Sequence, residues 1–541
     1  MHSTLHSAAI AGAGARPVEV QVDLSLGLPA FHLVGLPDHA CNDARVRVYT
    51  ALRNSGYQLP QKKITVNLAP GDLRKEGAAF DLPIALGVLA ASGLVPQPER
   101  PALVVGELAL SGDVLRVRGL LPIALEARRM GVSVLIAPEE NASEGALVQG
   151  LRVYGARSLT EAAEIFCGVS TRAPTTAPLS VPARDHGIDL ADVRGQESCK
   201  WALEVAAAGG HNTLLIGPPG AGKTMLARRL PTLLPALSFD EAVEATSIWS
   251  IAGRLAPGQG LLAAPPFRAP HHTTSVAGLV GGGTPLRPGE ISLAHRGALF
   301  LDELPEFGRA ALEALRQPLE DGEVTIVRTR DRATLPARFM LVAAMNPCPC
   351  GHASDKNPER CTCTLPQKQL YMGRVSGPIL DRFDLHLEAP ALRSQDLLGR
   401  PEGEPSAKVR ERVERARALQ RERYAGLAGI QCNAQLRGPA LRELTFATEK
   451  ARAALAGYLD LHRFSARAHD RVLKLARTIA DLEGSERVDE DHVSEASQLR
   501  CLDKPLTGRP GRSVSPLDVA RHAATRKSPG APPGEHPREG T

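Results

Sequence analysis

The sequence has few of the features that mark membrane, secreted or strongly charged proteins. Its longest nearly apolar run, residues 82–95, contains proline, glycine and serine and is too short to span a bilayer. The N-terminal residues lack the basic stretch and leucine-rich run of a signal peptide. The net charge is only +5, so any surface for a polyanion must be local. We therefore expect a cytoplasmic protein with no membrane partner.

Aromatic residues are also scarce, at 4% of the chain, which disfavours base stacking as a way of gripping nucleic acid. Nine cysteines in a long chain without an export signal favour a reducing compartment, where clustered thiols are more often metal ligands than disulfides. The 541 residues are enough for roughly three or four domains.

Changes in composition and periodicity along the chain predict its domains. Short β-rich runs and one Ala-rich helix over 83–92 indicate a first α/β domain. Alternating apolar strands and helices then predict a parallel sheet, and a purely helical pattern follows it, with helices expected over 407–424, 440–462, 466–482 and 489–499. The predicted units are an N-terminal domain (1–167), a linker (168–186), an α/β core (187–393) with a Cys-rich insert (348–363), a helical domain (394–503) and a disordered tail (504–541).

A phosphate-binding loop is predicted between a strand over 213–216 and a helix over 225–230. Its residues fit the pattern G-x-x-x-x-G-K-[ST], and the strand-loop-helix context is the one this motif requires. Lys223 would reach the β and γ oxygens of a nucleotide, and the Thr224 hydroxyl would hold Mg²⁺. The residues of the loop are Gly217, Pro218, Pro219, Gly220, Ala221, Gly222, Lys223 and Thr224.

Two later strands are predicted to end in polar residues at the same edge of the sheet. The apolar run 298–301 leads to Asp302, a candidate Mg²⁺ ligand, and to Glu303, a candidate for orienting the attacking water. Acids that merely cap the next helix are the alternative. A strand over 339–345 ends in Asn346, which could sense a γ-phosphate or its water.

Two arginines are candidate catalytic residues. Arg382 follows Asp381 in a short run from which it could reach a nucleotide in a neighbouring subunit, unless it pairs with Asp381 or Asp384 within its own chain. Arg467 lies in the first turn of the helix predicted over 466–482, where a solvent-exposed arginine is the alternative.

Four cysteines form the pattern C-x-C, ten residues, C-x-C directly after Asn346. Cys348, Cys350, Cys361 and Cys363 would suffice as soft ligands for a tetrahedral Zn²⁺ that braces the insert, although the commoner spacing is C-x₂-C. A loop with free thiols is the alternative.

The motifs, in their order along the chain, resemble those of AAA+ ATPases. The runs 267–273, 288–295, 380–384 and 465–467 narrow the resemblance to the magnesium-chelatase-like group and, within it, to the ComM/YifB family of competence DNA helicases. The resemblance covers nearly the whole chain except the tail. It implies a homo-hexameric ring, ATP bound between subunits, and single- and double-stranded DNA in the pore, with branch migration during natural transformation.

The N-terminal domain resembles the Lon protease fold through the runs 75–80, 106–112 and 118–121. Ala79 and Leu121 stand where that family carries its Ser nucleophile and Lys base. Neither side chain can perform acyl transfer, so an inactive scaffold is expected.

Alternating arginines in a hairpin predicted over 323–335 are the candidate DNA contacts. Arg328, Arg330 and Arg332 would share one face and track phosphates, and a solvated charged hairpin is the alternative. His271 and His272, ahead of the glycines 281–283, suggest a mobile loop that could contact DNA. The sequence therefore favours an ATP-driven DNA motor, with a chelatase-like ATPase that remodels a protein partner as the alternative.

Overall fold

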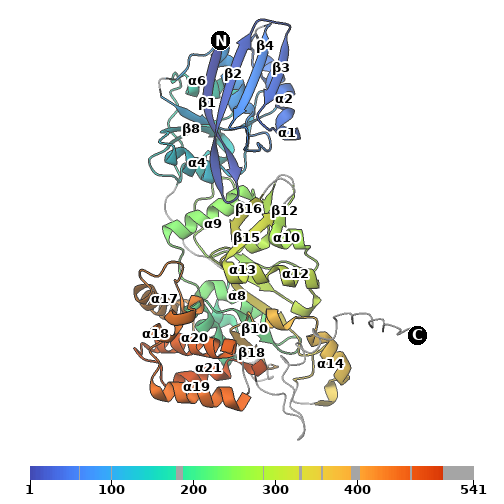
Figure 1. Ribbon diagram of the computed structural model, residues 1–541, viewed down its shortest axis with the longest axis vertical. Coiled ribbons are helices and arrows are strands. Elements are labelled where there is room, and N and C mark those ends of the chain that lie inside the picture. Colours follow the sequence, from blue (N-terminus) through green and yellow to red (C-terminus); the bar gives the residue numbers. More distant parts are fainter. Residues whose placement is uncertain are drawn as a thin grey trace, which may run out of the picture.

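The computed structural model describes residues 1–59, 61–98, 100–177, 187–283, 286–327, 332–354, 358–391, 403–462 and 466–503. The N-terminal sheet and its helices lie at one end of the long axis, and the second sheet and a group of C-terminal helices lie side by side at the other end (Figure 1). The mixed α/β architecture with a parallel sheet and a C-terminal helical region agrees with the predicted fold class. The predicted tail over 504–541 lies outside the described residues.

The N-terminal part is built on a mixed seven-stranded sheet in the order β3-β4-β2-β1-β5-β8-β9. Burial alternates along β2, where Val18, Val20, Val22 and Leu24 face the core, because successive side chains of a strand point to opposite faces. The strands are β1 (His2–Ala11), β2 (Gly14–Ser25), β3 (Ala30–Val34), β4 (Lys63–Ala69), β5 (Ala102–Val104), β8 (Val134–Pro138) and β9 (Arg152–Ala156), with the separate pair β6 (Glu107–Leu108) and β7 (Val114–Leu115).

Helices pack on this sheet, and one of them is apolar on nearly every side. The Ala-rich helix predicted over 83–92 is α3, which is buried along almost its whole length because it contacts β1 and β2 on one side and α2 on another. The helices are α1 (His39–Asn42), α2 (Ala44–Asn54), α3 (Asp81–Ser92), α4 (Leu120–Arg129), α5 (Ala142–Gly145) and α6 (Leu159–Phe166).

The second sheet has five strands in the order β11-β14-β17-β10-β18, and every neighbouring pair is parallel. Its inner strands are buried throughout because both faces are covered. Leu215 faces the core under α7 and α8, whereas Leu214 and Ile216 face α12 and the segment around α15. The elements are α7 (Glu197–Gly209), β10 (Thr213–Ile216), α8 (Lys223–Leu233), β11 (Phe267–Arg268), β14 (Ala298–Leu301), α12 (Arg309–Ala314), α13 (Arg316–Asp321), β17 (Met340–Met345), α14 (Leu365–Met372), α15 (Gly377–Leu380) and β18 (Leu385–Glu388).

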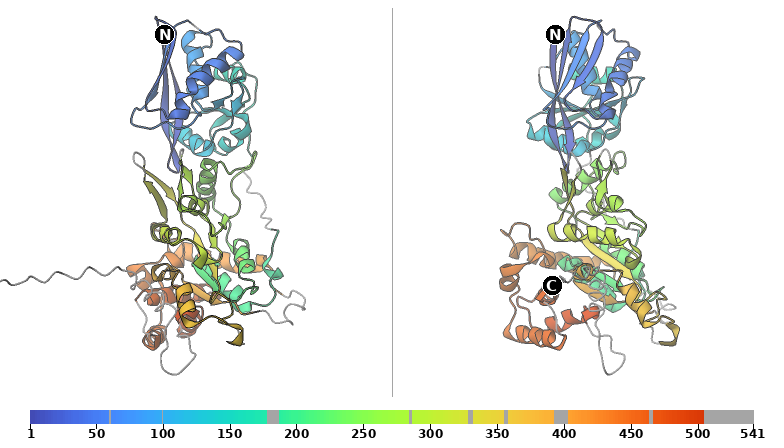
Figure 2. Two further views of the ribbon diagram at one scale, coloured as in Figure 1. Left: turned by 90° about the vertical axis from the view of Figure 1, so that its right-hand side faces the viewer. Right: turned by 45° about the vertical axis from the view of Figure 1, so that its right-hand side comes forward.

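A group of short elements lies between the two sheets (Figures 1 and 2). The hairpin predicted over 323–335 is the antiparallel pair β15–β16, and the glycines 281–283 begin a second pair, β12–β13. The elements are α9 (Phe239–Ile251), α10 (Val276–Val280), β12 (Gly281–Gly282), β13 (Arg287–Pro288), α11 (Glu290–Leu293), β15 (Glu323–Val327) and β16 (Arg332–Pro336).

A buried carboxylate joins the N-terminal part to α9. Glu144 accepts hydrogen bonds from Ser250 Oγ at 2.6 Å and from Arg116 Nη2 at 3.0 Å, while the same Arg116 nitrogen donates to Leu255 O at 2.8 Å. Burial raises the pKa of Glu144, and these donors oppose that shift. The N-terminal part is therefore docked by specific polar contacts as well as by apolar packing.

The C-terminal helices follow the predicted pattern with one correction. The single helix expected over 440–462 is two helices, because Phe446 has a positive φ of 48°, Ala447 forms a bridge with Val488, and Thr448 Oγ1 accepts from Ala451 N at 3.1 Å. The helices are α17 (Ser406–Arg423), α18 (Gly438–Leu444), α19 (Glu449–His462), α20 (Ala466–Glu483) and α21 (Glu490–Gln498). None of the helices in the described ranges combines the length and the hydrophobicity that a bilayer span requires.

Candidate nucleotide site and cysteine cluster

The predicted phosphate loop lies between β10 and α8, at the carboxyl end of the parallel sheet. Gly220 and Gly222 have positive φ values of 77° and 83°, and a Cβ on either would meet no atom within 4 Å. The loop therefore has an open surface on which backbone N–H groups and the start of α8 can receive an anion, as the phosphates of a nucleotide require.

Lys223 begins α8 and turns its ammonium back over the loop. Its Nζ donates to Gly217 O at 2.7 Å, to Pro218 O at 2.9 Å and to Asn346 Oδ1 at 3.1 Å. Burial lowers the pKa of Lys223, and the nearby Asp302 and Glu303 oppose that shift. The two residues predicted to face the γ-phosphate, Lys223 and Asn346, are thus in direct contact.

Thr224 and Asp302 meet across the ends of α8 and β14. Thr224 Oγ1 donates to Asp302 Oδ2 at 2.7 Å, and Asp302 Oδ1 accepts from Glu303 N at 3.0 Å. A hydroxyl and a carboxylate side by side are the oxygen ligands that Mg²⁺ takes beside a nucleotide. The residues present therefore fit the predicted Mg²⁺ site.

Glu303 has a strained backbone and a histidine partner. Its φ is 53° and its ψ 49°, a left-handed conformation that is uncommon outside glycine. Its Oε2 lies 3.3 Å from Nδ1 of His272, which also packs edge-on against Phe307. The structure therefore brings Lys223, Thr224, Asp302, Glu303 and Asn346 together at one edge of the sheet.

Arg382 and Arg467 lie at the opposite edge. Asn212, which precedes β10, donates from Nδ2 to Arg382 O at 2.9 Å, so Arg382 lies at the amino end of the strand whose carboxyl end carries the phosphate loop. The Arg382 side chain pairs with Glu320 rather than with Asp381 or Asp384, the partners of the alternative interpretation. Arg467 Nη1 lies 3.4 Å from Asp381 Oδ2, and the Arg467 side chain is 63% exposed.

This opposite edge is rich in arginine. Burial lowers the pKa of Arg382, and the neighbouring Arg467, Arg316 and Arg437 lower it further. Several guanidinium groups close together repel one another, so a bound anion at this surface would be favourable.

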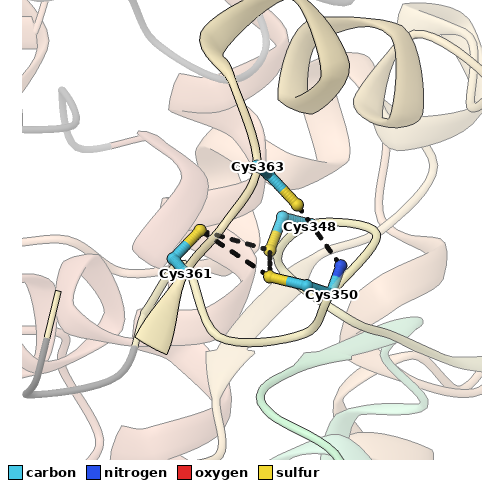
Figure 3. A group of neighbouring side chains, drawn as sticks. All are labelled: Cys348, Cys350, Cys361 and Cys363. Atoms are coloured by element: carbon cyan, nitrogen blue, oxygen red, sulfur yellow. Dashed lines mark hydrogen bonds between the residues drawn. The ribbon is translucent and has the colours of Figure 1, made fainter. Parts of the chain in front are cut away.

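The four predicted cysteines converge into one cluster (Figure 3). Their sulfur atoms all lie within 4.8 Å of one another, with Cys348 to Cys350 at 3.3 Å, Cys350 to Cys361 at 3.8 Å and Cys348 to Cys361 at 3.9 Å. Cys350 N also donates to Cys363 Sγ at 3.4 Å. The cluster is thus a group of four thiols that could hold a metal ion.

The predicted DNA contacts are only partly described. Arg328 and Arg330 lie outside the described residues, and of Arg332 only the backbone is described, at the start of β16 opposite Val327. Near this hairpin, a Cβ on Gly12 would lie 3.1 Å from Thr334 O, so the turn between β1 and β2 touches β16.

Two residues of the site were not predicted from the sequence. Gln196, buried before α7, donates to Ala221 O of the phosphate loop at 3.0 Å and to Pro390 O at 2.7 Å. His272 stands out in the sequence only as half of the pair His271-His272. The signal that could have placed His272 is Arg268, two residues after Pro266. Arg268 forms a two-pronged ion pair with Glu290 at 2.6 and 2.9 Å and so fixes β11, the strand just before His271 and His272.

Three family models match successive parts of the chain. Residues 189–397 match the model of magnesium chelatase subunit ChlI, and residues 403–500 match the model of its C-terminal region. Residues 20–141 match a further model, described as subunit ChlI of Mg-chelatase.

The sequence similarity to two bacterial proteins extends over nearly the full length of this chain and of each relative. YifB of Escherichia coli is 45% identical over 508 residues, which are 93% of this chain and 98% of YifB. The competence protein ComM of Haemophilus influenzae is 43% identical over 505 residues, which are 92% of this chain and 97% of ComM. A shorter match, 29% identical over 161 residues, covers 29% of this chain and 34% of the DNA repair protein RadA of Halalkalibacterium halodurans.

Proposed function

Since this chain belongs to the ComM/YifB family of magnesium-chelatase-like AAA+ proteins, we propose that it is an ATP-driven DNA motor, a helicase or branch-migration translocase. The observation that carries the proposal is the convergence of Lys223, Thr224, Asp302 and Asn346 at the carboxyl edge of the parallel sheet. Such an edge is where open α/β sheets bind their ligands.

Each residue at this edge has a proposed role in ATP hydrolysis. The loop 217–224 binds the phosphates, and Lys223 exchanges its carbonyl partners for β and γ oxygens. Mg²⁺ held by Thr224 and Asp302 would neutralise charge that develops on the phosphates. Glu303 orients the attacking water, and Asn346 positions it beside the γ-phosphate.

Arg382 and Arg467 are proposed to act on the nucleotide of a neighbouring subunit in a homo-hexamer. Their place at the amino edge of the sheet supports this, because each is far from its own phosphate loop. The surrounding arginines add positive charge at the same surface, where the γ-phosphate of a neighbour would offset their repulsion.

DNA is the proposed track, in single-stranded, double-stranded and branched forms. The names of ComM, a competence protein, and of RadA, a DNA repair protein, support a DNA-related role. We propose that Arg328, Arg330 and Arg332 contact phosphates and that the motor promotes integration of incoming DNA during natural transformation, which would place it in the cytoplasm.

The N-terminal part is proposed to be an inactive Lon-like scaffold. Ala79 is half-buried, and Leu121 is buried with its N–H directed at Ser250 Oγ, 3.4 Å away. Side chains without a nucleophile or a base cannot perform peptidase chemistry. We also propose that the four-cysteine cluster binds Zn²⁺, which takes four thiolates in structural sites.

A protein-remodelling ATPase is the second candidate, favoured by the family models named for a magnesium chelatase subunit. ATP turnover measured with and without forked DNA over a salt series separates the two. A DNA motor should be stimulated, with DNA affinity falling as salt rises, and replacing Arg328, Arg330 and Arg332 with Glu should remove the stimulation but keep basal turnover. Turnover that no DNA changes would favour the remodelling ATPase.

A further inference from the structure

The cysteine cluster touches the candidate nucleotide site in two places. Cys348 is buried two residues after Asn346, whose Oδ1 accepts from Lys223 Nζ at 3.1 Å. Gly351, inside the cluster's loop, packs directly on the phosphate loop: a Cβ there would lie only 2.4 Å from Cδ of Pro219. The cluster therefore forms one wall of the nucleotide site.

The spacing of the sulfurs matches a metal centre. With Zn–S bonds of about 2.3 Å, a tetrahedral site places its sulfurs about 3.8 Å apart. Two sulfur pairs lie at about this distance, Cys350 to Cys361 at 3.8 Å and Cys348 to Cys361 at 3.9 Å, and Cys348 to Cys350 is closer, at 3.3 Å. Four thiolates at this distance would repel one another, so a divalent cation is needed to hold them together in ionised form.

The connectivity shows what such a metal would hold in place. The cluster joins residues 348–350, at the end of β17, to residues 361–363, just before α14, and thereby closes the loop that contains Gly351. Gly351 has a φ of 84°, a left-handed conformation that glycine adopts readily. The closed loop holds Gly351 in this conformation. If no metal closed this loop, the chain would gain conformational freedom at Gly351, the residue that packs on Pro219.

We propose that Zn²⁺ bound by Cys348, Cys350, Cys361 and Cys363 sets the ATP affinity of the phosphate loop by holding Gly351 against Pro219. This inference rests on the proposed function, because it requires that the loop 217–224 bind ATP. Loss of the metal releases the wall of the site and weakens ATP binding, while the sheet that carries the loop stays folded.

The test combines metal analysis with equilibrium binding of a fluorescent ATP analogue to the full chain. Wild-type protein should contain about one zinc per chain, as one four-thiolate site requires. Stripping it with a chelator, or replacing Cys361 and Cys363 with Ser, should weaken binding at least about tenfold, a loss of ~1.4 kcal/mol. Returning Zn²⁺ should restore the stripped wild type but not the double variant. Cys167→Ser, in the N-terminal part, is the control and should change neither quantity.

A second variant separates the proposed contact from loss of folding. Gly351→Ala should keep its zinc but bind the analogue more weakly, because the new Cβ displaces Pro219. Metal-free wild-type protein, or zinc removal that changes affinity less than twofold, would overturn the inference while leaving ATP binding intact. Zinc-loaded wild type that binds no ATP would instead refute the proposed function as well.

Discussion

Replacing Arg382 with Ala tests whether ATP is hydrolysed between subunits. Asn212 contacts Arg382 at the amino end of β10, and Gly217 begins the phosphate loop at its carboxyl end. Asn212 and Gly217 are five positions apart along this extended strand, or about 17 Å at ~3.3 Å per residue. That separation exceeds the reach of an arginine side chain, so Arg382 should act on a neighbouring subunit's nucleotide.

The expected loss is large because this arginine would face the charge on the transferring phosphoryl group. Arginine fingers contribute roughly 10³ to 10⁵ in turnover, or about 4–7 kcal/mol of transition-state stabilisation. Arg382→Ala should therefore lower turnover by this factor while ATP binding, measured separately, stays near wild type. Arg415→Ala, which removes an exposed arginine from α17, should leave turnover unchanged.

Mixing two inactive variants is the decisive assay. Lys223→Ala lacks its own phosphate-binding lysine but supplies Arg382, and Arg382→Ala has the complementary defect. In randomly mixed rings with head-to-tail interfaces, about one interface in four combines an intact loop with an intact arginine. Turnover should therefore recover toward about a quarter of wild type. No recovery at any ratio, with mixed assembly confirmed, would refute the action between subunits.

Two further predictions concern the sheet edge and its support. Glu303→Gln should bind ATP but barely hydrolyse it, because the water loses its carboxylate while the phosphate loop is intact; near wild-type turnover in a single-turnover assay would remove Glu303 from the mechanism. His295 is buried, its Nδ1 accepts from Arg338 N at 3.0 Å, and burial lowers its pKa to about 4. The folded protein thus keeps His295 neutral, and stability should fall by up to about 3 kcal/mol as pH drops from about 6.5 to 4. Unfolding free energies should show a shallower pH dependence in His295→Asn, and equal slopes would contradict this assignment.

The convergence of the candidate nucleotide-site residues could be predicted because its signals are local or follow from strand order. The motif 217–224 fixes its own conformation, and parallel strands ending in Asp302 and Asn346 must meet at one edge. The amphipathic pattern of α20 likewise gave its bounds to within a residue. The sequence therefore predicts which polar residues follow each strand of the parallel sheet.

The remaining features depend on contacts between segments distant in sequence. The break at Phe446 is made by the bridge between Ala447 and Val488, which no helical period reveals. The contact between Gly351 and Pro219 joins two loops that are more than a hundred residues apart. The docking of Ser250 on Glu144 depends in the same way on how two sheets are placed.

The central claim, that ATP hydrolysis drives movement along DNA, is tested most directly by a branch-migration assay. Purified protein, ATP and Mg²⁺ would be added to a labelled four-way junction, and the released duplexes would be measured over time. Wild type should resolve the junction only with hydrolysable ATP, and Glu303→Gln should bind the junction without resolving it. Resolution that proceeds equally without ATP hydrolysis, or no resolution by an active, DNA-bound ATPase, would contradict a DNA motor.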